Sequence, residues 1–245
     1  MRRLATGSRL NSDLVNFYMK LLVLKFSCEV NKIYCFDTWF ATKLFQNPDL
    51  AGFRNTTSSK WNKFFRSCNY NGVQRWTVKV DLFRYQIILI PVFVDSEDPD
   101  GRHFQMCVVH IGRTLKKTRR RGPRPPEYNY KITLSHCCSL GWPFKAREKI
   151  KTYFRLEHYR QHGSWLGEIF SVAKPKVPQQ SNSVDCGVHA CANAYTACLG
   201  FPLDDRIPIH NLEGCNEFRK HMALSIVETQ IQERFEYPAD RMTLP

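Results

Sequence analysis

The stretch that decides the fold is VPQQSNSVDCG, residues 177–187, which runs from a proline-containing loop into an apolar segment. The segment that follows predicts a helix from Cys186 to Leu199, because it is apolar on nearly every side. Gly200 and Pro202 then mark the end of that helix. Since a helix that is apolar all round must be buried, the sequence places a cysteine at the first position of a buried helix.

A cysteine at that position is suited to nucleophilic chemistry. The unpaired amides and the positive end of the helix dipole favour the thiolate, so we expect the pKa of Cys186 to lie below its ordinary value. Asp185 fits the capping position, and Gly187 leaves the backbone open to a substrate carbonyl. Gln180, six residues before the cysteine, lies on a loop from which its amide can donate to a developing oxyanion. A nucleophile with an oxyanion donor is half of an acyl-transfer site.

A general base is then required, and His103 is the best placed of the eight histidines. It begins a predicted strand directly after an acidic turn that contains Gly101. A strand end can hold an imidazole rigidly beside a thiolate that comes from another element. His189 lies one helical turn after Cys186 and is expected to point into the packing.

Two helices and one strand stand out in the rest of the chain. Residues 11–22 carry apolar side chains at helical spacing. Residues 216–235 predict a terminal helix with Leu224 and Val227 on its buried face. Residues 87–94 form a continuous apolar run, which is typical of a central strand covered on both faces.

The remaining pattern completes an α+β fold. Further strands are predicted at 76–80, 103–109, 130–134 and 168–172, and a further helix at 145–159. No repeat and no linker interrupts the chain. Residues 1–245 are therefore predicted to form one domain, with a central mixed sheet flanked by helices.

Composition excludes several classes of protein. Hydrophobic residues make up 43% and charged residues 24% of the chain, as in ordinary globular proteins. The longest apolar run, residues 87–94, is far short of the roughly 20 residues that span a bilayer, so we expect no membrane association. Ten cysteines without an export signal indicate free thiols in a reducing compartment, the nucleus or the cytoplasm. Four of them lie among apolar residues and are expected to be buried: Cys28, Cys35, Cys107 and Cys191.

The net charge of +14 predicts an acidic partner. Much of this charge lies in a basic, proline-rich loop insertion at about 113–128, with its basic residues between Lys116 and Arg124. This loop has three interpretations: a nuclear-import signal, an anion-binding loop, or a solvated insertion. The charge alone leaves three kinds of acidic partner open: nucleic acid, which we favour least, an anionic surface, and an acidic protein.

Several motifs together resemble one family. Gln180-x5-Cys186-Gly187, with Asp185 between them and the histidine earlier in the chain, resembles the signature of the Ulp/sentrin-specific proteases, which share a clan with the adenovirus protease. Three other stretches also resemble family segments in the same order. These are residues 10–19 (its first helix), residues 76–92 (the segment leading to the histidine) and residues 218–220 (its terminal helix).

The resemblance implies a papain-like cysteine protease domain of the adenovirus-protease type. It implies cleavage of the peptide or isopeptide bond after the C-terminal Gly-Gly of SUMO or a related ubiquitin-like modifier. Cys186 would attack the glycine carbonyl, His103 would act as base and then as acid, and Gln180 would bind the oxyanion. No metal and no cofactor are implied, and a monomer is expected.

The sequence departs from the family pattern at the substrate tunnel. The family follows its histidine with a tryptophan that lids the tunnel for the diglycine, and here that position is Phe104. A second tunnel tryptophan precedes the family's first helix, and here that position is Arg9. With Trp76, these two residues are our candidates for the tunnel wall.

The third departure concerns the aspartate that orients the family's histidine. Alignment on the Ser-Leu-Gly at 139–141 puts Cys138 at that position, whereas alignment on the Ile-Thr at 132–133 puts His136 there. Neither is a carboxylate, and Asn129 or Asp100 could substitute. A zinc site that uses His136 and Cys138 is disfavoured because no Cys-x2-Cys pair supports it. Two functions remain open: an active protease, and a catalytically impaired pseudoprotease that still binds a modifier.

Overall fold

The computed structural model describes residues 2–48, 59–94, 102–116, 127–142, 146–172, 175–207, 209 and 211–236. Most of the basic loop predicted at 113–128 lies outside the described residues, as does Asp100. Its two ends belong to strands: β3 (His103–Leu115) enters the loop and β4 (Tyr128–Cys137) leaves it.

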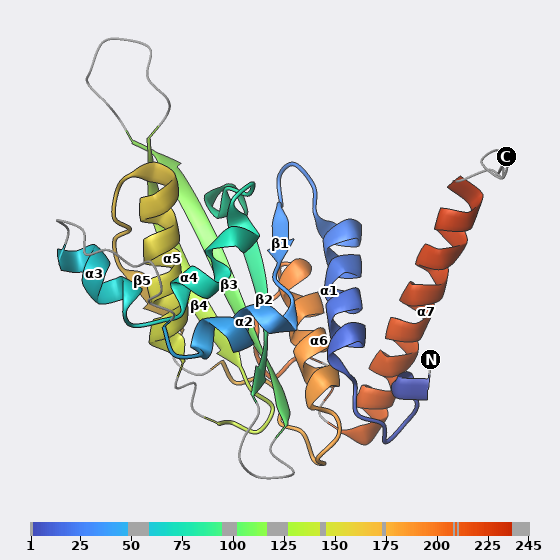
Figure 1. Ribbon diagram of the computed structural model, residues 1–245. Helices are drawn as coiled ribbons and strands as arrows, with labels where there is room; N and C mark the ends of the chain where they lie inside the picture. The colour runs from blue at the N-terminus through green and yellow to red at the C-terminus, as the bar shows by residue number, and fades with distance from the viewer. Residues whose placement is uncertain are drawn as a thin grey trace, which may run out of the picture.

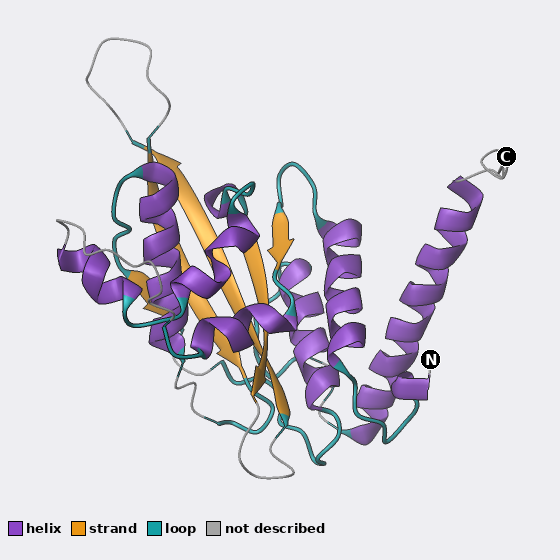
Figure 2. Ribbon diagram, viewed as in Figure 1, coloured by secondary structure: helices purple, strands orange, loops and turns teal. Residues whose placement is uncertain are grey.

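The centre of the molecule is a mixed sheet, as predicted, and it has five strands (Figure 2). The strands lie in chain order: β1 (Ile33–Cys35), β2 (Ile87–Val94), β3, β4 and β5 (Ile169–Ser171). The two outer pairs are parallel and the two inner pairs are antiparallel.

A proline lies inside the central strand β2. Pro91 is tolerated there because β1 pairs with β2 only as far as Leu89. The proline nitrogen therefore faces no strand partner on that side. On the other side, Pro91 lies opposite Met106 of β3.

Helices lie on both faces of the sheet (Figure 1). On one face are α1 (Ser12–Phe26), α6 (Cys186–Cys198), α7 (Leu212–Glu236) and the short η1 (Arg2–Leu4). On the other are α2 (Thr38–Phe45), α3 (Ser59–Phe65), α4 (Tyr70–Val73), η2 (Gln74–Thr77), η3 (Leu82–Arg84) and α5 (Arg147–His162).

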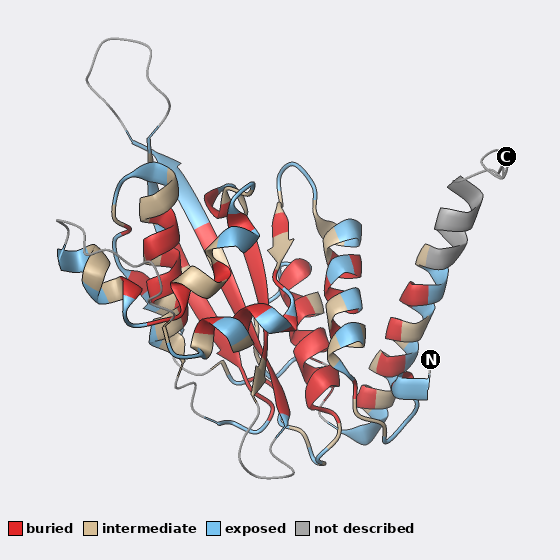
Figure 3. Cartoon of the chain, in the orientation of Figure 1, coloured by how far each residue is buried: buried red, intermediate tan, exposed pale blue. Residues whose placement is uncertain are grey.

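The core is therefore divided into two layers by the sheet. Along β3, Phe104 and Met106 pack with the layer of α1 and α6, whereas Cys107 and Val109 pack with the layer of α2 and α5. This alternation is the period of two expected of a strand covered on both faces. Helix α6 is buried over nearly its whole length, as its apolar sequence predicted (Figure 3).

The prediction of a strand at 76–80 was wrong, because Gln74–Thr77 is a 3-10 helix. The tertiary contacts of Thr77 override the alternating pattern. Its hydroxyl donates to Glu157 Oε1 at 2.6 Å, and its carbonyl accepts from Arg160 at 3.2 Å.

The face predicted for the terminal helix was also wrong. Leu224 is 62% exposed in α7, whereas Arg219, Met222 and Ile226 are buried at helical spacing. Because one of these buried residues is an arginine, a search for apolar residues alone selects the wrong face.

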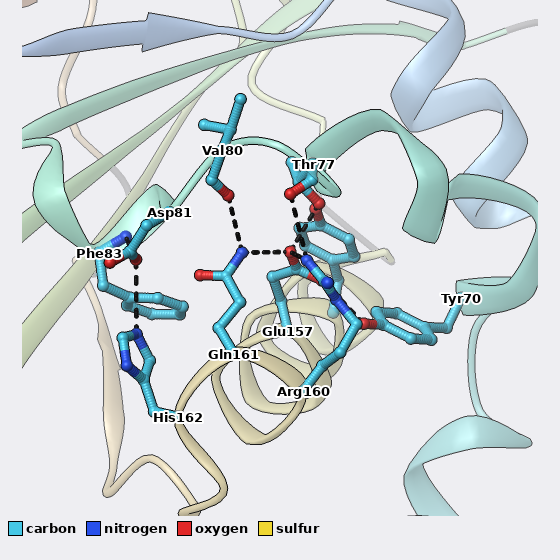
Figure 4. A network of polar contacts seen from close by, with 10 residues as sticks. Tyr70, Thr77, Val80, Asp81, Phe83, Glu157, Arg160, Gln161 and His162 are labelled. Atoms are coloured by element: carbon cyan, nitrogen blue, oxygen red, sulfur yellow. Dashed lines mark hydrogen bonds and ion pairs between the residues drawn. The ribbon is translucent and has the colours of Figure 1, made fainter.

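Helix α5 is joined to the segment before β2 by a network around Glu157 (Figure 4). This carboxylate is fully buried. It accepts from Tyr70 Oη at 2.7 Å, Thr77 Oγ1 at 2.6 Å, Gln161 Nε2 at 2.6 Å and Arg160 Nη2 at 2.5 Å. The network fixes segment 70–77 against α5 although the two are far apart in the chain.

All ten cysteines are free thiols. Cys107 and Cys191 are buried as expected, but Cys28 is exposed and Cys35 is partly buried. No helix within the described ranges is both long and apolar enough to cross a membrane.

Candidate active site

Cys186 is the first residue of α6 and is almost fully buried. The loop before it is held by Asn182, whose Oδ1 accepts from the backbone nitrogens of Val184 and Asp185 at 2.9 and 3.0 Å. Asp185 occupies the N-cap position but makes no side-chain cap bond. Its carboxylate instead accepts from Asn182 Nδ2 at 2.7 Å and from Arg219 Nη2 at 2.5 Å.

Arg219 was missed as a site residue in the sequence, although it lies in the stretch 218–220 that resembles the family. It is buried, and its Nη2 also donates to the carbonyl of Ser8 at 2.7 Å. One guanidinium thus joins α7, the N-terminal segment and the residue before the cysteine. The signal available in the sequence was an arginine at a buried helical position.

Burial raises the pKa of the Cys186 thiol, whereas the sequence predicted a lowered value. The backbone N–H groups of Phe104 and Gly187 and the charge of Arg9 act in the opposite direction. Desolvation is the largest of these effects and penalises the thiolate. The helix terminus therefore reduces the cost of ionisation without removing it.

Gly187 has a structural reason to be glycine that differs from the predicted one. A Cβ there would lie 2.9 Å from the Cβ of Leu10. The missing side chain thus permits α6 to pack against the segment before α1. This packing also places Arg9 near the sulfur of Cys186.

His103 is the first residue of β3 and is 2% exposed. Its Nε2 lies 3.3 Å from the Sγ of Cys138. Burial lowers the pKa of His103 to about 4. Within the described part of the chain, Cys186 and His103 make no hydrogen bond with each other, although Phe104, the residue after His103, reaches Cys186 through its backbone N–H.

Of the two candidates for the orienting position, Cys138 is the one whose side chain lies within hydrogen-bond distance of His103. In the β3–β4 register, His136 lies opposite Cys107, and its Nε2 is 2.9 Å from Gln105 Oε1. Asn129, another possible substitute, pairs with Thr114 near the far end of the strands.

The thiol of Cys138 lies where backbone amides converge. The N–H groups of Leu140, Gly141 and Trp142 all act to lower its pKa, but burial outweighs them and the pKa is raised. Both Cys138 and His103 are thus neutral at neutral pH. Three amides around one atom form a nest suited to an anion.

Gln180 lies beside the turn that carries Cys138. Its backbone N–H donates to the Ser139 carbonyl at 2.9 Å, and its Oε1 accepts from Ser139 Oγ at 2.6 Å. Its Nε2 donates to the Asn182 carbonyl at 2.6 Å. Because an amide nitrogen carries two hydrogens, one remains for an oxyanion.

The three tunnel candidates lie in different places. Arg9 is near Cys186. The ring of Phe104 is buried and packs 4.8 Å from that of Phe93. Trp76 lies in η2, where its ring packs 5.5 Å from that of Phe40 of α2.

Trp142 is a neighbour of the site that the sequence analysis did not single out. Its indole ring centroid lies 4.9 Å from the imidazole centroid of His103. The available signal was a Gly-Trp pair, residues 141–142, several residues after the strand predicted at 130–134. No group of three or more histidine, cysteine or carboxylate side chains converges as a metal site in the described ranges.

Comparisons with known proteins identify a family for most of the chain. Residues 8–234 match the model of the Ulp1 protease family, C-terminal catalytic domain. The chain is similar to a sentrin-specific protease of Caenorhabditis elegans (30% identity over 184 residues, 74% of this chain and 20% of the relative). It is also similar to sentrin-specific protease 2 of Homo sapiens (25% identity over 236 residues, 91% of this chain and 30% of the relative). The chain thus spans less than a third of the length of these relatives.

A solved structure shares the fold. The C-terminal Ulp1 protease domain, crystallised in complex with Smt3, the yeast ortholog of SUMO, superimposes with a TM-score of 0.58. The match covers 93% of this chain and 81% of that one, at 19% identity. Together with the mixed sheet and its flanking helices, this confirms the predicted papain-like α+β fold.

Proposed function

The chain belongs to the Ulp1 protease family, and from that membership we propose that it is a cysteine protease acting on SUMO or a related ubiquitin-like modifier. The bond cleaved is the peptide or isopeptide bond after the modifier's C-terminal Gly-Gly. SUMO is proposed because the family neighbour described above was crystallised with Smt3.

The proposed roles are those that the family resemblance implies, and the contacts of these side chains support them. Cys186 attacks the glycine carbonyl while His103 takes up the thiol proton, which it later gives to the leaving amine. Gln180 donates its remaining amide hydrogen to the oxyanion. Cys138 contacts the imidazole at Nε2. The observation that supports this scheme most directly is the contact of Cys186 Sγ with the N–H of Phe104, next to the base.

A modifier-binding pseudoprotease is the second candidate, and it too has specific support. In the serine-protease triad, the aspartate that orients the histidine is worth about four decades in rate. In this chain a neutral thiol contacts the imidazole instead. With the pKa of Cys186 raised and that of His103 lowered, the thiolate–imidazolium pair costs more to form.

An electrophilic probe separates the two candidates. Purified protein is incubated with SUMO that carries a vinyl sulfone in place of its terminal carboxylate, beside an equivalent ubiquitin probe. Cys186→Ala and His103→Ala run in parallel, and adducts are read on a gel. We expect a covalent SUMO adduct in the wild type, none in Cys186→Ala, and much less in His103→Ala.

Binding of unmodified SUMO to the same samples completes the test. Binding of SUMO without any covalent adduct would support the pseudoprotease and exclude the active protease. If the protein neither binds SUMO nor forms an adduct with the SUMO probe, SUMO is excluded as the substrate. An adduct with the ubiquitin probe alone would show that ubiquitin is the preferred modifier.

A further inference from the structure

The turn that ends β4, residues Cys138–Trp142, contacts His103 from two sides. Cys138 Sγ approaches the edge of the imidazole, 3.3 Å from Nε2. Trp142 lies against the ring itself, with centroids 4.9 Å apart and ring planes inclined by 54°. The imidazole is therefore held at an edge by one residue and covered by another.

The edge contact alone orients the imidazole weakly. A thiol is a poor hydrogen-bond donor and acceptor, whereas a carboxylate accepts strongly and fixes the tautomer of its histidine. Cys138 and His103 are both neutral at neutral pH, so their contact has no charge assistance. Something else must restrict the ring if His103 is to act as a base.

We propose that Trp142 is a positioning residue for His103, whose indole ring fixes the plane of the imidazole where no carboxylate does so. Packing of one ring against another replaces part of the directional hydrogen bond. The inference rests on the proposed function only in taking His103 as the base that activates Cys186.

The turn itself is well anchored, as a positioning element must be. Gly141 adopts a φ of +65°, in the left-handed region, and its N–H donates to the Cys138 carbonyl at 3.1 Å. The same carbonyl accepts from Gln179 Nε2 at 3.3 Å. A Cβ at Gly141 would lie 3.2 Å from Gln179 Oε1, which favours glycine on two grounds.

These contacts also connect the turn to the oxyanion donor. Ser139 of the turn bonds to Gln180 through both its hydroxyl and its carbonyl. The position of the indole and the position of the Gln180 amide are thus set by one stretch of backbone. A shift of this turn would displace the base and the oxyanion donor together.

The test measures the reactivity of Cys186 without a protein substrate. Trp142→Leu, Trp142→Phe and the control Phe170→Leu are made in the wild type and in a Cys138→Asp background. Phe170 is a half-exposed aromatic residue on β5. The rate of alkylation of Cys186 by iodoacetamide is followed by mass spectrometry, which separates it from the other nine cysteines. His103→Ala gives the rate without a base.

We expect Trp142→Leu to slow alkylation by about three- to tenfold, the size typical of losing one aromatic contact. The alkylation rate of Trp142→Phe should stay within about twofold of the wild-type rate, and Phe170→Leu should react like the wild type. In the Cys138→Asp background the carboxylate anchors the ring, so the loss from Trp142→Leu should shrink to less than about twofold. With a fluorogenic SUMO substrate, Trp142→Leu should lower kcat and leave KM unchanged.

Three results would overturn the inference: unchanged alkylation in Trp142→Leu, an equal loss in both backgrounds, or no effect of His103→Ala. Thermal melting identifies a variant that has merely unfolded; if Trp142→Leu is such a variant, Trp142→Met, which is also apolar and has no ring, takes its place and should show the same loss. If the wild type cleaves no SUMO but alkylation behaves as expected, the proposed protease activity on SUMO is wrong and the positioning role stands.

Discussion

Desolvation is the dominant effect at the level of single residues in this site. It raises the pKa of Cys186 and of Cys138 and lowers that of His103 to about 4. Each of these shifts favours the neutral form, because burial penalises charge of either sign. A carboxylate next to His103 would oppose the shift on the histidine, and at that position the chain has a thiol.

Replacing that thiol by a carboxylate should therefore change both the pKa and the rate. Cys138→Asp should raise the pKa of His103 from about 4 toward its ordinary value near 6.5, since an anion stabilises the imidazolium. The backbone N–H groups of residues 140–142 can donate hydrogen bonds to the new carboxylate. Cleavage or alkylation should rise by at least about tenfold.

NMR titration of the His103 ring resonances measures the first effect, and the iodoacetamide rate measures the second. Cys138→Ser, which adds no charge, is the matched control and should leave the pKa low. A pKa of His103 unchanged in Cys138→Asp would mean that the new carboxylate does not contact the imidazole.

At the level of secondary-structure elements, two buried polar contacts hold together segments that lie far apart in the chain. Asp185 and Arg219 join the start of α6 to α7, and the same arginine reaches Ser8 of the N-terminal segment. Glu157 joins α5 to α4 and η2. The first contact involves Asp185, the residue before the candidate nucleophile. The elements joined by the second contact, α4, η2 and α5, lie on the opposite face of the sheet from α6 and α7 (Figure 1).

Loss of the Glu157 carboxylate should destabilise the fold. Glu157→Ala leaves the hydroxyls of Tyr70 and Thr77 and the charge of Arg160 without their buried partner. We expect a loss of about 3–5 kcal/mol in the free energy of unfolding, measured by urea denaturation. Glu148→Ala on the same helix, where the carboxylate is exposed and pairs with Lys151, should cost less than about 1 kcal/mol. Equal effects of the two variants would contradict this account.

At the scale of the whole molecule, desolvation is the largest effect on the pKa of several histidines. Burial lowers the pKa of both His103 and His136 to about 4. Three more histidines shift in the same direction: His110, His158 and His221. The folded protein therefore holds several imidazoles neutral at a pH where the unfolded chain protonates them.

The stability of the protein should consequently fall in mild acid. Between about pH 6.5 and pH 4 the unfolded chain binds more protons than the folded one, so the free energy of unfolding decreases as the pH falls through that window. Each of His103 and His136 can contribute up to roughly 3 kcal/mol to this decrease in the free energy of unfolding. Urea denaturation at pH 7 and pH 5 measures the effect, and His136→Gln should reduce the difference. A difference unaltered by His136→Gln would assign the pH dependence to other groups.

The elements that the sequence predicted well are those defined by local periodicity. The helix that begins at Cys186 and the strand at 87–94 appear as predicted because each is a continuous apolar segment with clear end signals. The prediction of a strand at 76–80 failed because polar contacts with α5 determine the conformation of Thr77. The prediction of the buried face of α7 failed because a buried arginine, Arg219, occupies a position where an apolar residue was expected.

By itself, the sequence determined the α+β fold, the buried helix headed by Cys186, the strand headed by His103, and the loop that carries Gln180. These follow from short-range patterns that one stretch of chain contains. Only the tertiary structure decided that Cys138 rather than His136 meets the base, that Trp142 covers it, and that the thiol of Cys186 is harder to ionise than its helix position suggests. The register of β3 and β4 and the burial of the site settle these points, because both arise from contacts between residues that are distant in the chain.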